Sequence, residues 1–338
     1  MIGFHANATV HFGNVTSTGT PVDRLMQGIN QIFTGQSGTF FFMMLSAFLL
    51  YRDITPKNAF SKVNRRLRTL LIPWVLWNMI GLAANHPFDQ EPGQIARDFV
   101  MSRFCEQLWF VEALLLFLVL IPVYMRILRN RAAGGILVAA LFILRYAAFP
   151  MMESLQVFVS QRFVNEVLRM LVHLPVYTLG AYLGLNYAEA VMGEIYQEKH
   201  RKITVLAALA VLVISYLPME YWLQDTCFML RSAALWVICS KQLFVFTPRW
   251  WMQVSFYIYA IHNFILYFVG KLIRLSGVFA EYYASQTVTI AFALLWRLAM
   301  TAAAFLLALI SAAILMKYTP RLYEMLSGGR VPDKRNDA

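Results

Sequence analysis

The sequence has few charged residues: Asp, Glu, Lys and Arg make up 14% of its 338 residues, against about 25% in soluble domains. It also has only three cysteines, Cys105, Cys227 and Cys239, and their spacing fits no metal or redox motif. It contains no HExxH motif, no glycine-rich phosphate loop and no GxSxG elbow. We therefore expect neither a soluble globular domain nor a metal centre, and any catalysis must use scattered His, Arg and acidic side chains.

The sequence is instead rich in apolar residues: 59% of the residues are hydrophobic and 15% are aromatic. A membrane-spanning helix needs roughly 20 mostly apolar residues, and no apolar segment shows the alternation typical of barrel strands. The sequence thus predicts an all-α polytopic membrane helix bundle surrounded by lipid. About nine spans are expected, at 31–51, 69–85, 107–125, 133–150, 167–186, 203–219, 226–246, 251–271 and 288–316.

The basic residues indicate how this bundle is oriented. The segment Thr39–Asn78 is interpreted as a membrane helix, a short basic turn and a second membrane helix. Counted over alternate loops, nineteen Lys and Arg residues lie on the side of this turn and six on the opposite side. The positive-inside rule then places the turn and the C-terminus in the cytoplasm. This pattern also explains the net charge of +11, so we expect no nucleic-acid partner.

The two ends of the sequence are polar. Residues 1–30 are too polar to span a membrane, although they begin with the apolar MIGF. We therefore expect a truncated first helix whose earlier part would precede Met1. Residues 1–327 form one predicted transmembrane domain, and residues 328–338, GGRVPDKRNDA, form a polar cytoplasmic tail.

Several charged or titratable residues fall within the predicted spans, where a charge is costly and usually functional. His262 lies mid-helix and Arg297 lies deep in its span, whereas Arg145, Arg169 and Arg231 lie nearer to helix ends. The alternative for the histidine is a satisfied core position. The alternative for the arginines is a side chain that extends to the nearer membrane interface.

The basic turn also has two interpretations. Arg65 and Arg68 are three residues apart on a helix, so their guanidinium groups could bind the phosphate oxygens of a phosphorylated donor. The alternative is an anchor for anionic lipid headgroups. The loop 85–107 on the opposite side is acidic and includes Glu106, and a solvated acidic surface is its simplest explanation.

Four short motifs together resemble the acyltransferase-3 family of integral membrane O-acyltransferases. FMMLSAFLL at Phe42–Leu50 is similar to that family's FFxxSGFLL helix, and NRRLRTLLIPWVLW at Asn64–Trp77 is similar to its RxxR–LLxPYxxW element. QLWFVEALL at Gln107–Leu115 resembles its HLWFLxxL segment, and SFYIYAIHNFIL at Ser255–Leu266 resembles its SxGIYLxHxxIL helix. The four motifs occur in the family's order, and the resemblance covers nearly the whole chain.

The resemblance implies a reaction and its participants. Family members transfer an acyl group, usually acetyl, from cytoplasmic acyl-CoA to a hydroxyl group of a cell-surface or exported glycan. This implies a protein of the bacterial inner membrane. The implied catalytic residues are His5 as the base and His262 as a residue that orients the substrate. His5 matches better than His11, because it follows the apolar MIGF and its distance from Phe42 fits the family spacing better.

The resemblance also implies binding residues. The donor, acyl-CoA and by default acetyl-CoA, would be bound by Arg65, Arg66 and Arg68. The cavity for the sugar acceptor would be shaped by Glu106, Trp109, Arg231 and Arg297. Gln107 replaces a family histidine, which removes a titratable group, and Ser46 is the candidate nucleophile if an acyl-enzyme forms. Two other functions stay open: a transporter or flippase for a lipid-linked glycan, and a catalytically inactive relative.

Overall fold

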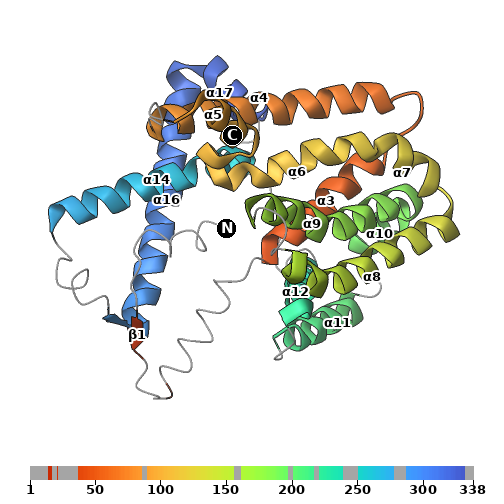
Figure 1. Cartoon of the computed structure of the whole chain (residues 1–338). Helices are drawn as coiled ribbons and strands as arrows, with labels where there is room; N and C mark the ends of the chain where they lie inside the picture. Colours follow the sequence, from red (N-terminus) through yellow and green to blue (C-terminus); the bar gives the residue numbers. More distant parts are fainter. Residues whose placement is uncertain are drawn as a thin grey trace. The chain divides into compact units, whose positions relative to one another are not determined.

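The computed structural model describes residues 14–16, 21, 37–85, 90–155, 161–196, 201–216, 221–238, 250–277 and 287–331. These residues are almost all helical (Figure 1), which confirms the predicted all-α membrane helix bundle. The exception is a parallel pairing of β1 (Asn14–Thr16) with β2 (Thr287–Thr289), in which Val15 lies opposite Val288. Each strand has only three residues, so the pairing links two segments and adds no sheet layer to the helices.

Each of the nine predicted spans overlaps a described helix. The corresponding elements are α3 (Ser37–Tyr51), α4 (Ala59–Asn85), the run of η1 (Arg103–Leu108), α6 (Trp109–Phe117), η2 (Leu118–Leu120) and α7 (Ile121–Ile127), then α8 (Arg131–Leu155), α9 (Gln161–Asn186), α11 (Arg201–Ile214), α12 (Tyr221–Ile238), α13 (Trp250–Gln253) with α14 (Ser255–Ser276), and α16 (Ile290–Tyr318). The apolar runs of the sequence therefore locate the long helices correctly.

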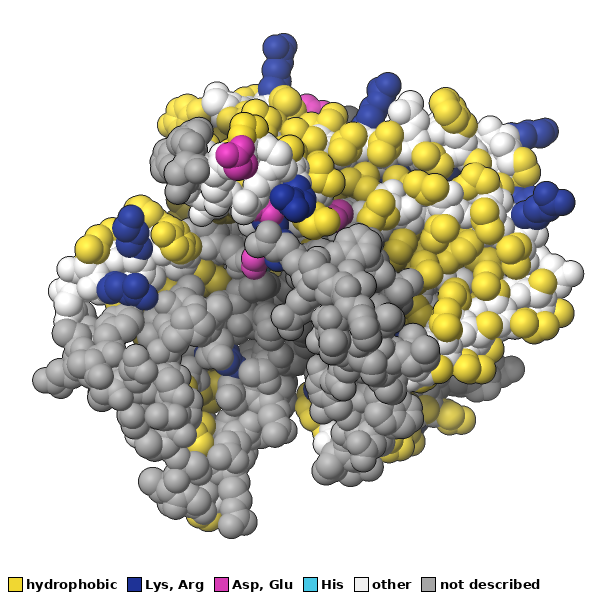
Figure 2. Space-filling view, in the orientation of Figure 1, with side chains coloured by type: hydrophobic (Ala, Val, Ile, Leu, Met, Phe, Trp, Pro, Cys, Tyr) yellow, Lys and Arg dark blue, Asp and Glu magenta, His cyan; other side chains and the backbone are white. Residues whose placement is uncertain are grey.

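The described helices have the length and surface of membrane spans. Four helical stretches are long and apolar enough to cross a membrane, namely Ala59–Asn85, Pro92–Ile127, Ser255–Ser276 and Ile290–Tyr318. Figure 2 shows hydrophobic side chains over broad areas of the described surface. Ile136, Phe268 and Ile310 are among the large apolar side chains that are exposed. Such surfaces are stable against lipid and unfavourable against water, so the chain is an integral membrane protein.

Some helices depart from the sequence prediction. Three short ones lie outside the predicted spans: α5 (Pro92–Val100), α10 (Ala188–Tyr196) and α17 (Pro320–Ser327). They have eight or nine residues, too few to cross a bilayer and so too few to stand out in a search for spans. Helix α4 begins at Ala59 rather than at residue 69, and the basic turn is therefore confined to residues 52–58.

The helices form two compact units. We call residues 36–68 and 110–246 the α9 unit, and residues 1–35, 69–109 and 247–338 the α14 unit. Helix α4 contributes its residues up to Arg68 to the α9 unit and the rest to the α14 unit. Each unit is thus assembled from segments that are far apart in the sequence.

In the α9 unit, helices α3 and α9 pack closely at two glycines. A Cβ atom at Gly180 would lie 2.1 Å from the Met44 carbonyl oxygen, and one at Gly184 would lie 2.7 Å from the Phe48 carbonyl oxygen. The two glycines form a GxxxG motif, which allows helix backbones to approach each other in a membrane. Glycine at these positions therefore determines how close α3 and α9 can be.

In the α14 unit, helix α14 packs against α16 through apolar and small side chains. Leu266 of α14 forms a buried cluster with Met300 and Ala304 of α16. Ala308 continues this face of α16 and has no exposed surface. Small residues at this spacing let two membrane helices pack closely. His262 lies one turn before Leu266 and is buried in the same unit.

Candidate functional site

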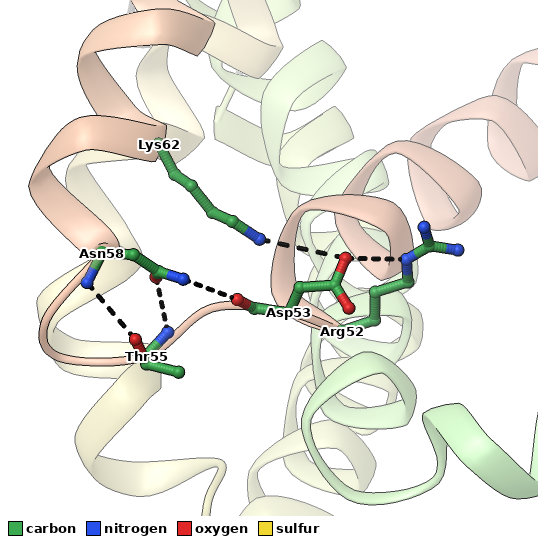
Figure 3. A network of polar contacts seen from close by, with 5 residues as sticks. All are labelled: Arg52, Asp53, Thr55, Asn58 and Lys62. Atoms are coloured by element: carbon green, nitrogen blue, oxygen red, sulfur yellow. Dashed lines mark hydrogen bonds and ion pairs between the residues drawn. The ribbon is translucent and has the colours of Figure 1, made fainter.

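The turn between α3 and α4 is held by a reciprocal cap. The Thr55 hydroxyl accepts a hydrogen bond from the Asn58 N–H (3.3 Å), and the Asn58 side-chain oxygen accepts one from the Thr55 N–H (2.7 Å; Figure 3). This is the arrangement of a capping box, and Pro56 follows the cap where proline is favoured. The cap satisfies backbone N–H groups at the start of α4, and it does so whether or not the residues that follow are apolar. Helix α4 can therefore begin before the apolar run.

Asp53 pairs with two of the basic residues in this stretch. Its carboxylate lies 3.0 Å from Arg52 Nε and 4.0 Å from Lys62 Nζ (Figure 3). Exposed ion pairs contribute about 0–1 kcal/mol each, so these contacts orient the turn more than they stabilise it. Because Asp53 partly neutralises Arg52 and Lys62, the positive field of this stretch is concentrated further along α4, at Arg65 and Arg68.

The three arginines predicted to bind the donor are placed differently. Arg65 and Arg68 are exposed on α4, whereas Arg66 is half-buried. The Nη2 atom of Arg66 donates a hydrogen bond to the Ser46 hydroxyl, which joins α4 to α3. A guanidinium stays protonated in proteins, so Arg66 cannot be the base that Ser46 would need as a nucleophile. Arg65 and Arg68 keep the exposure that phosphate binding requires.

A buried group of tyrosines accompanies Arg66 in the α9 unit. The ring centroids of Tyr51, Tyr124 and Tyr177 lie 6.2, 6.3 and 6.4 Å apart. The Tyr124 hydroxyl lies 2.5 Å from the Thr178 hydroxyl, and the charge of Arg66 acts on Tyr177. Polar groups gather in this way in apolar bundles because each needs a partner. The tyrosines come from three helices, and the only sequence signal for them is a phenol within an apolar run.

His262 has no exposed surface, and the backbone of α14 holds its ring. Its Nδ1 atom lies 2.6 Å from the Tyr259 carbonyl oxygen. Because a carbonyl oxygen only accepts hydrogen bonds, Nδ1 carries a proton, and in the neutral form of the ring Nε2 is then the accepting nitrogen. An imidazole in this tautomer can take a proton from a hydroxyl group at Nε2.

Gln107 connects η1 to the helix that carries His262. Its Nε2 donates to the Ala260 carbonyl oxygen at 2.7 Å, and its Oε1 accepts from Asn263 Nδ2 at 3.0 Å. The Tyr259 hydroxyl donates a third hydrogen bond, to the Gln107 backbone carbonyl oxygen. Gln107 therefore positions α14 through its hydrogen bonds, although its side chain carries no titratable group.

The other predicted site residues are divided between the units. In the α14 unit, Glu106 is exposed, Trp109 is half-buried at the start of α6, and Arg297 is buried on α16. Arg231 is buried on α12 of the α9 unit, and His5 lies outside the described residues. The structure places His262 in one unit with Glu106, Trp109 and Arg297, and it places Arg65, Arg66 and Arg68 in the other with Arg231.

Arg231 is buried because its guanidinium group contacts Ser215 and Tyr216, which follow the end of α11. Its Nη2 donates to the Ser215 carbonyl oxygen at 2.7 Å, and its Nε donates to the Ser215 hydroxyl at 3.4 Å. Its guanidinium carbon lies 3.6 Å from the centroid of the Tyr216 ring. A cation at a helix C-terminus satisfies terminal carbonyl groups and interacts favourably with the helix dipole. A place for Arg231 in an acceptor cavity stays a prediction.

The described residues include exposed cations on α4. Within the described ranges, no three His, Cys, Asp or Glu side chains are grouped to hold a metal. The exposed guanidinium groups of Arg65 and Arg68 have the charge and the planar geometry that bind oxygen atoms of anions.

One of three comparisons with known proteins identifies a family for the chain. Neither the curated proteins nor the solved structures contain a match to the chain. A family model described as an acyltransferase domain matches residues 1–316. The match includes the arginines of α4, the Gln107 contact and His262, and it covers nearly all of the chain. The chain therefore belongs to the acyltransferase-3 family and is a membrane acyltransferase.

Proposed function

We propose that the protein transfers an acetyl group from acetyl-CoA to a hydroxyl group of a cell-surface or exported glycan in a bacterial inner membrane. The observation that carries this proposal is His262, a buried imidazole whose Nδ1 is engaged by the Tyr259 carbonyl oxygen. The exposed arginines of α4 supply the second requirement, a cationic surface for the donor. The family membership supports acyl transfer as the reaction class.

Donor binding is assigned to Arg65 and Arg68. Coenzyme A carries several phosphate groups, and charge-assisted hydrogen bonds from guanidinium groups are among the strongest contacts to them. Arg66 is turned toward Ser46 and holds α3 against α4, so its effect on the donor is indirect. The positive-inside pattern puts this surface in the cytoplasm, where acyl-CoA is found, and the acceptor would approach from the opposite side.

The chemical step requires a base for the acceptor hydroxyl. As the hydroxyl oxygen attacks the thioester carbonyl carbon, the base takes the hydroxyl proton. The carbon–sulfur bond then breaks, and the proton passes to the departing thiolate, which leaves an ester and the coenzyme A thiol. Two histidines are candidates: His5 is the base that the family resemblance implies, and His262 is supported by its tautomer.

The test uses the purified full-length protein in proteoliposomes with radiolabelled acetyl-CoA and a panel of bacterial glycans. We expect label to enter a glycan and to be released by mild alkali, as from an ester. His5→Ala and His262→Gln should each lower the rate by about 10²- to 10⁴-fold if the histidine transfers the proton. His173→Gln is the matched control, because His173 is also buried but lies in the α9 unit.

The arginines give a second test of the same proposal. Arg65→Gln and Arg68→Gln should each raise the KM for acetyl-CoA about tenfold, because a charge-assisted hydrogen bond is lost. Arg66→Gln should mainly lower the unfolding temperature, since it removes the contact with Ser46. Arg129→Gln is the control for an exposed cation elsewhere. The proposal fails if no glycan is labelled, or if both histidine variants label the glycan at the wild-type rate.

A further inference from the structure

The C-terminal segment Pro320–Val331 folds onto the α14 unit, and we call it the latch. It lies beyond the residues 1–316 that match the family model. Helix α17 forms its first part, and Tyr323, Leu326 and Ser327 of this helix are buried. An eight-residue helix is too short to be stable alone in water, so packing against the rest of the unit must hold it.

The latch contacts two aromatic side chains of α14 through one aromatic ring and one cation of its own. The rings of Tyr323 and Tyr257 lie 5.5 Å apart. The guanidinium carbon of Arg330 lies 4.4 Å from the centroid of the Phe256 ring, and its Nη1 donates to the Ser327 carbonyl oxygen at 3.0 Å. Phe256 and Tyr257 belong to the first turn of α14, so the latch fixes the end of this helix that lies nearer to His262.

Trp77 of α4 connects the latch to the middle of α14. Its indole N–H donates to the Leu326 carbonyl oxygen at 3.1 Å. The same ring lies 5.7 Å from Tyr257 and 5.8 Å from Phe264. Tyr257 precedes His262 and Phe264 follows it, so Trp77 and the latch support α14 on both sides of the histidine.

Gly328 lets the end of the latch lie close to the backbone of α4. Helix α17 ends in a Schellman motif, with Gly328 and Gly329 at φ of 67° and 75° and the Gly329 N–H bound to the Glu324 carbonyl oxygen at 2.8 Å. A Cβ atom at Gly328 would lie 2.2 Å from the Thr69 carbonyl oxygen. A Cβ atom at Gly329 would have nothing within 4 Å. Both glycines need a positive φ, but only Gly328 also needs the close approach.

We propose that the latch is a positioning element that holds helix α14, and with it His262, in the geometry for acyl transfer. The claim that the latch supports acyl transfer rests on the proposed function, whereas the claim that it holds α14 does not. The coupling is physical: the latch and Trp77 contact α14 at residues before and after His262. Burial raises the pKa of Tyr323 to about 12, so its phenol stays neutral at physiological pH and packing, rather than titration, holds the latch.

The experiment compares Gly328→Ala with Gly329→Ala in the full-length protein in detergent. Both variants place an alanine at a positive φ, but only Gly328→Ala forces a methyl group against Thr69. The first readout is the reaction of His262 with diethyl pyrocarbonate, located by mass spectrometry. The second is amide hydrogen exchange in residues 255–266. We expect Gly328→Ala to raise both several-fold over wild type, and Gly329→Ala to raise them clearly less.

Activity gives the third readout. A displaced histidine should lower kcat about tenfold in Gly328→Ala and leave the KM for acetyl-CoA near its wild-type value, because orientation and not donor binding is lost. If α14 loosens while kcat is unchanged, the latch does not position the reaction and the proposal is overturned. If the wild-type protein transfers no acetyl group, the proposed function fails, and the first two readouts still decide whether the latch holds α14.

A milder variant covers the case in which Gly328→Ala does not fold. Arg330→Gln removes the contact with Phe256 and the hydrogen bond to Ser327 without placing any atom in a crowded position. We expect it to change His262 reactivity and kcat in the same direction as Gly328→Ala and to a smaller extent. Wild-type behaviour of Arg330→Gln in all three readouts, together with equal behaviour of the two glycine variants where both fold, would falsify the latch.

Discussion

At the scale of single residues, Gln107 shows how a neutral amide can fix the helix that carries a catalytic candidate. One end of its side chain donates to Ala260 and the other accepts from Asn263. Both partners lie on α14, on either side of His262 in the sequence. A substitution at position 107 therefore tests whether this contact holds α14, and it does so without changing the histidine itself.

Gln107→Met removes both hydrogen bonds at similar volume and should cost about 1–3 kcal/mol of unfolding free energy, because Asn263 Nδ2 loses its partner. Gln107→Glu should cost more at pH 7, since a carboxylate oxygen would face the Ala260 carbonyl oxygen in place of the N–H donor at 2.7 Å. Thermal unfolding in detergent, followed by tryptophan fluorescence, measures both. The exposed Glu106→Gln is the neutral control.

The pH dependence of Gln107→Glu has a definite sign. Burial disfavours the charged form of the introduced carboxyl group. Its destabilising effect therefore grows as the carboxyl group ionises with rising pH and shrinks as pH falls, when the protonated acid can donate to Ala260 again. The unfolding temperature relative to wild type should recover between pH 7 and pH 5. If the unfolding temperature does not recover and Gln107→Met behaves identically, the hydrogen bonds of Gln107 to Ala260 and Asn263 do not hold α14 as described.

Residue-level features differ in how readily the sequence reveals them. His262 stands out because an imidazole within an apolar span is costly and so calls for a role. The contacts of Gln107 and Arg231 do not stand out, because their partners are largely backbone carbonyl groups brought near by tertiary packing. The contact of Arg66 is hidden for a similar reason: Arg66 is adjacent to Arg65 in the sequence, but consecutive residues point in directions about 100° apart on a helix.

At the scale of helices, the contact between α3 and α9 depends on Gly180 and Gly184. Gly180→Ala should reduce the unfolding free energy by about 1–3 kcal/mol, because the methyl group pushes the Met44 backbone away. Gly184→Ala should act in the same direction and less strongly, since its contact distance is 2.7 Å rather than 2.1 Å. The measurement is thermal unfolding of each purified variant in detergent.

Gly135→Ala is the matched control for these glycines. It also lies within a helix, but the nearest atom to its added Cβ would be the Tyr182 hydroxyl oxygen, at 3.6 Å. It should be neutral or gain up to about 1 kcal/mol from helix propensity. Equal unfolding temperatures for Gly180→Ala and Gly135→Ala would show that α3 and α9 do not pack as closely as described.

Helix positions and helix boundaries follow from different physical signals. Hydropathy over roughly 20 residues locates the long helices, because lipid requires their apolar surface. It misplaces the start of α4, since capping by Thr55 and Asn58 depends on hydrogen bonds and not on apolar surface. It also passes over α17, whose eight residues are held by the α14 unit rather than by lipid. The GxxxG motif in α9 was a readable signal for the α3 contact.

At the scale of the whole molecule, the sequence predicts the bundle correctly and adds an orientation that stays a prediction. The apolar composition and the family match agree on an integral membrane acyltransferase. The orientation follows from charge alone, with nineteen cations on one side and six on the other. It matters for function, because it decides whether Arg65 and Arg68 face the compartment that contains acyl-CoA.

Single cysteines introduced at exposed positions test this orientation. In a background with Cys105→Ala, Cys227→Ala and Cys239→Ala, the variants Lys57→Cys and Ser276→Cys place thiols at the basic turn and at the end of α14, both exposed in the structure. A membrane-impermeant maleimide should label Ser276→Cys in intact spheroplasts and leave Lys57→Cys unlabelled. In inverted vesicles the two should exchange behaviour. Labelling of Lys57→Cys in intact spheroplasts would put the donor surface outside the cell, where cytoplasmic acetyl-CoA could not reach it, and the proposed reaction would then need another donor.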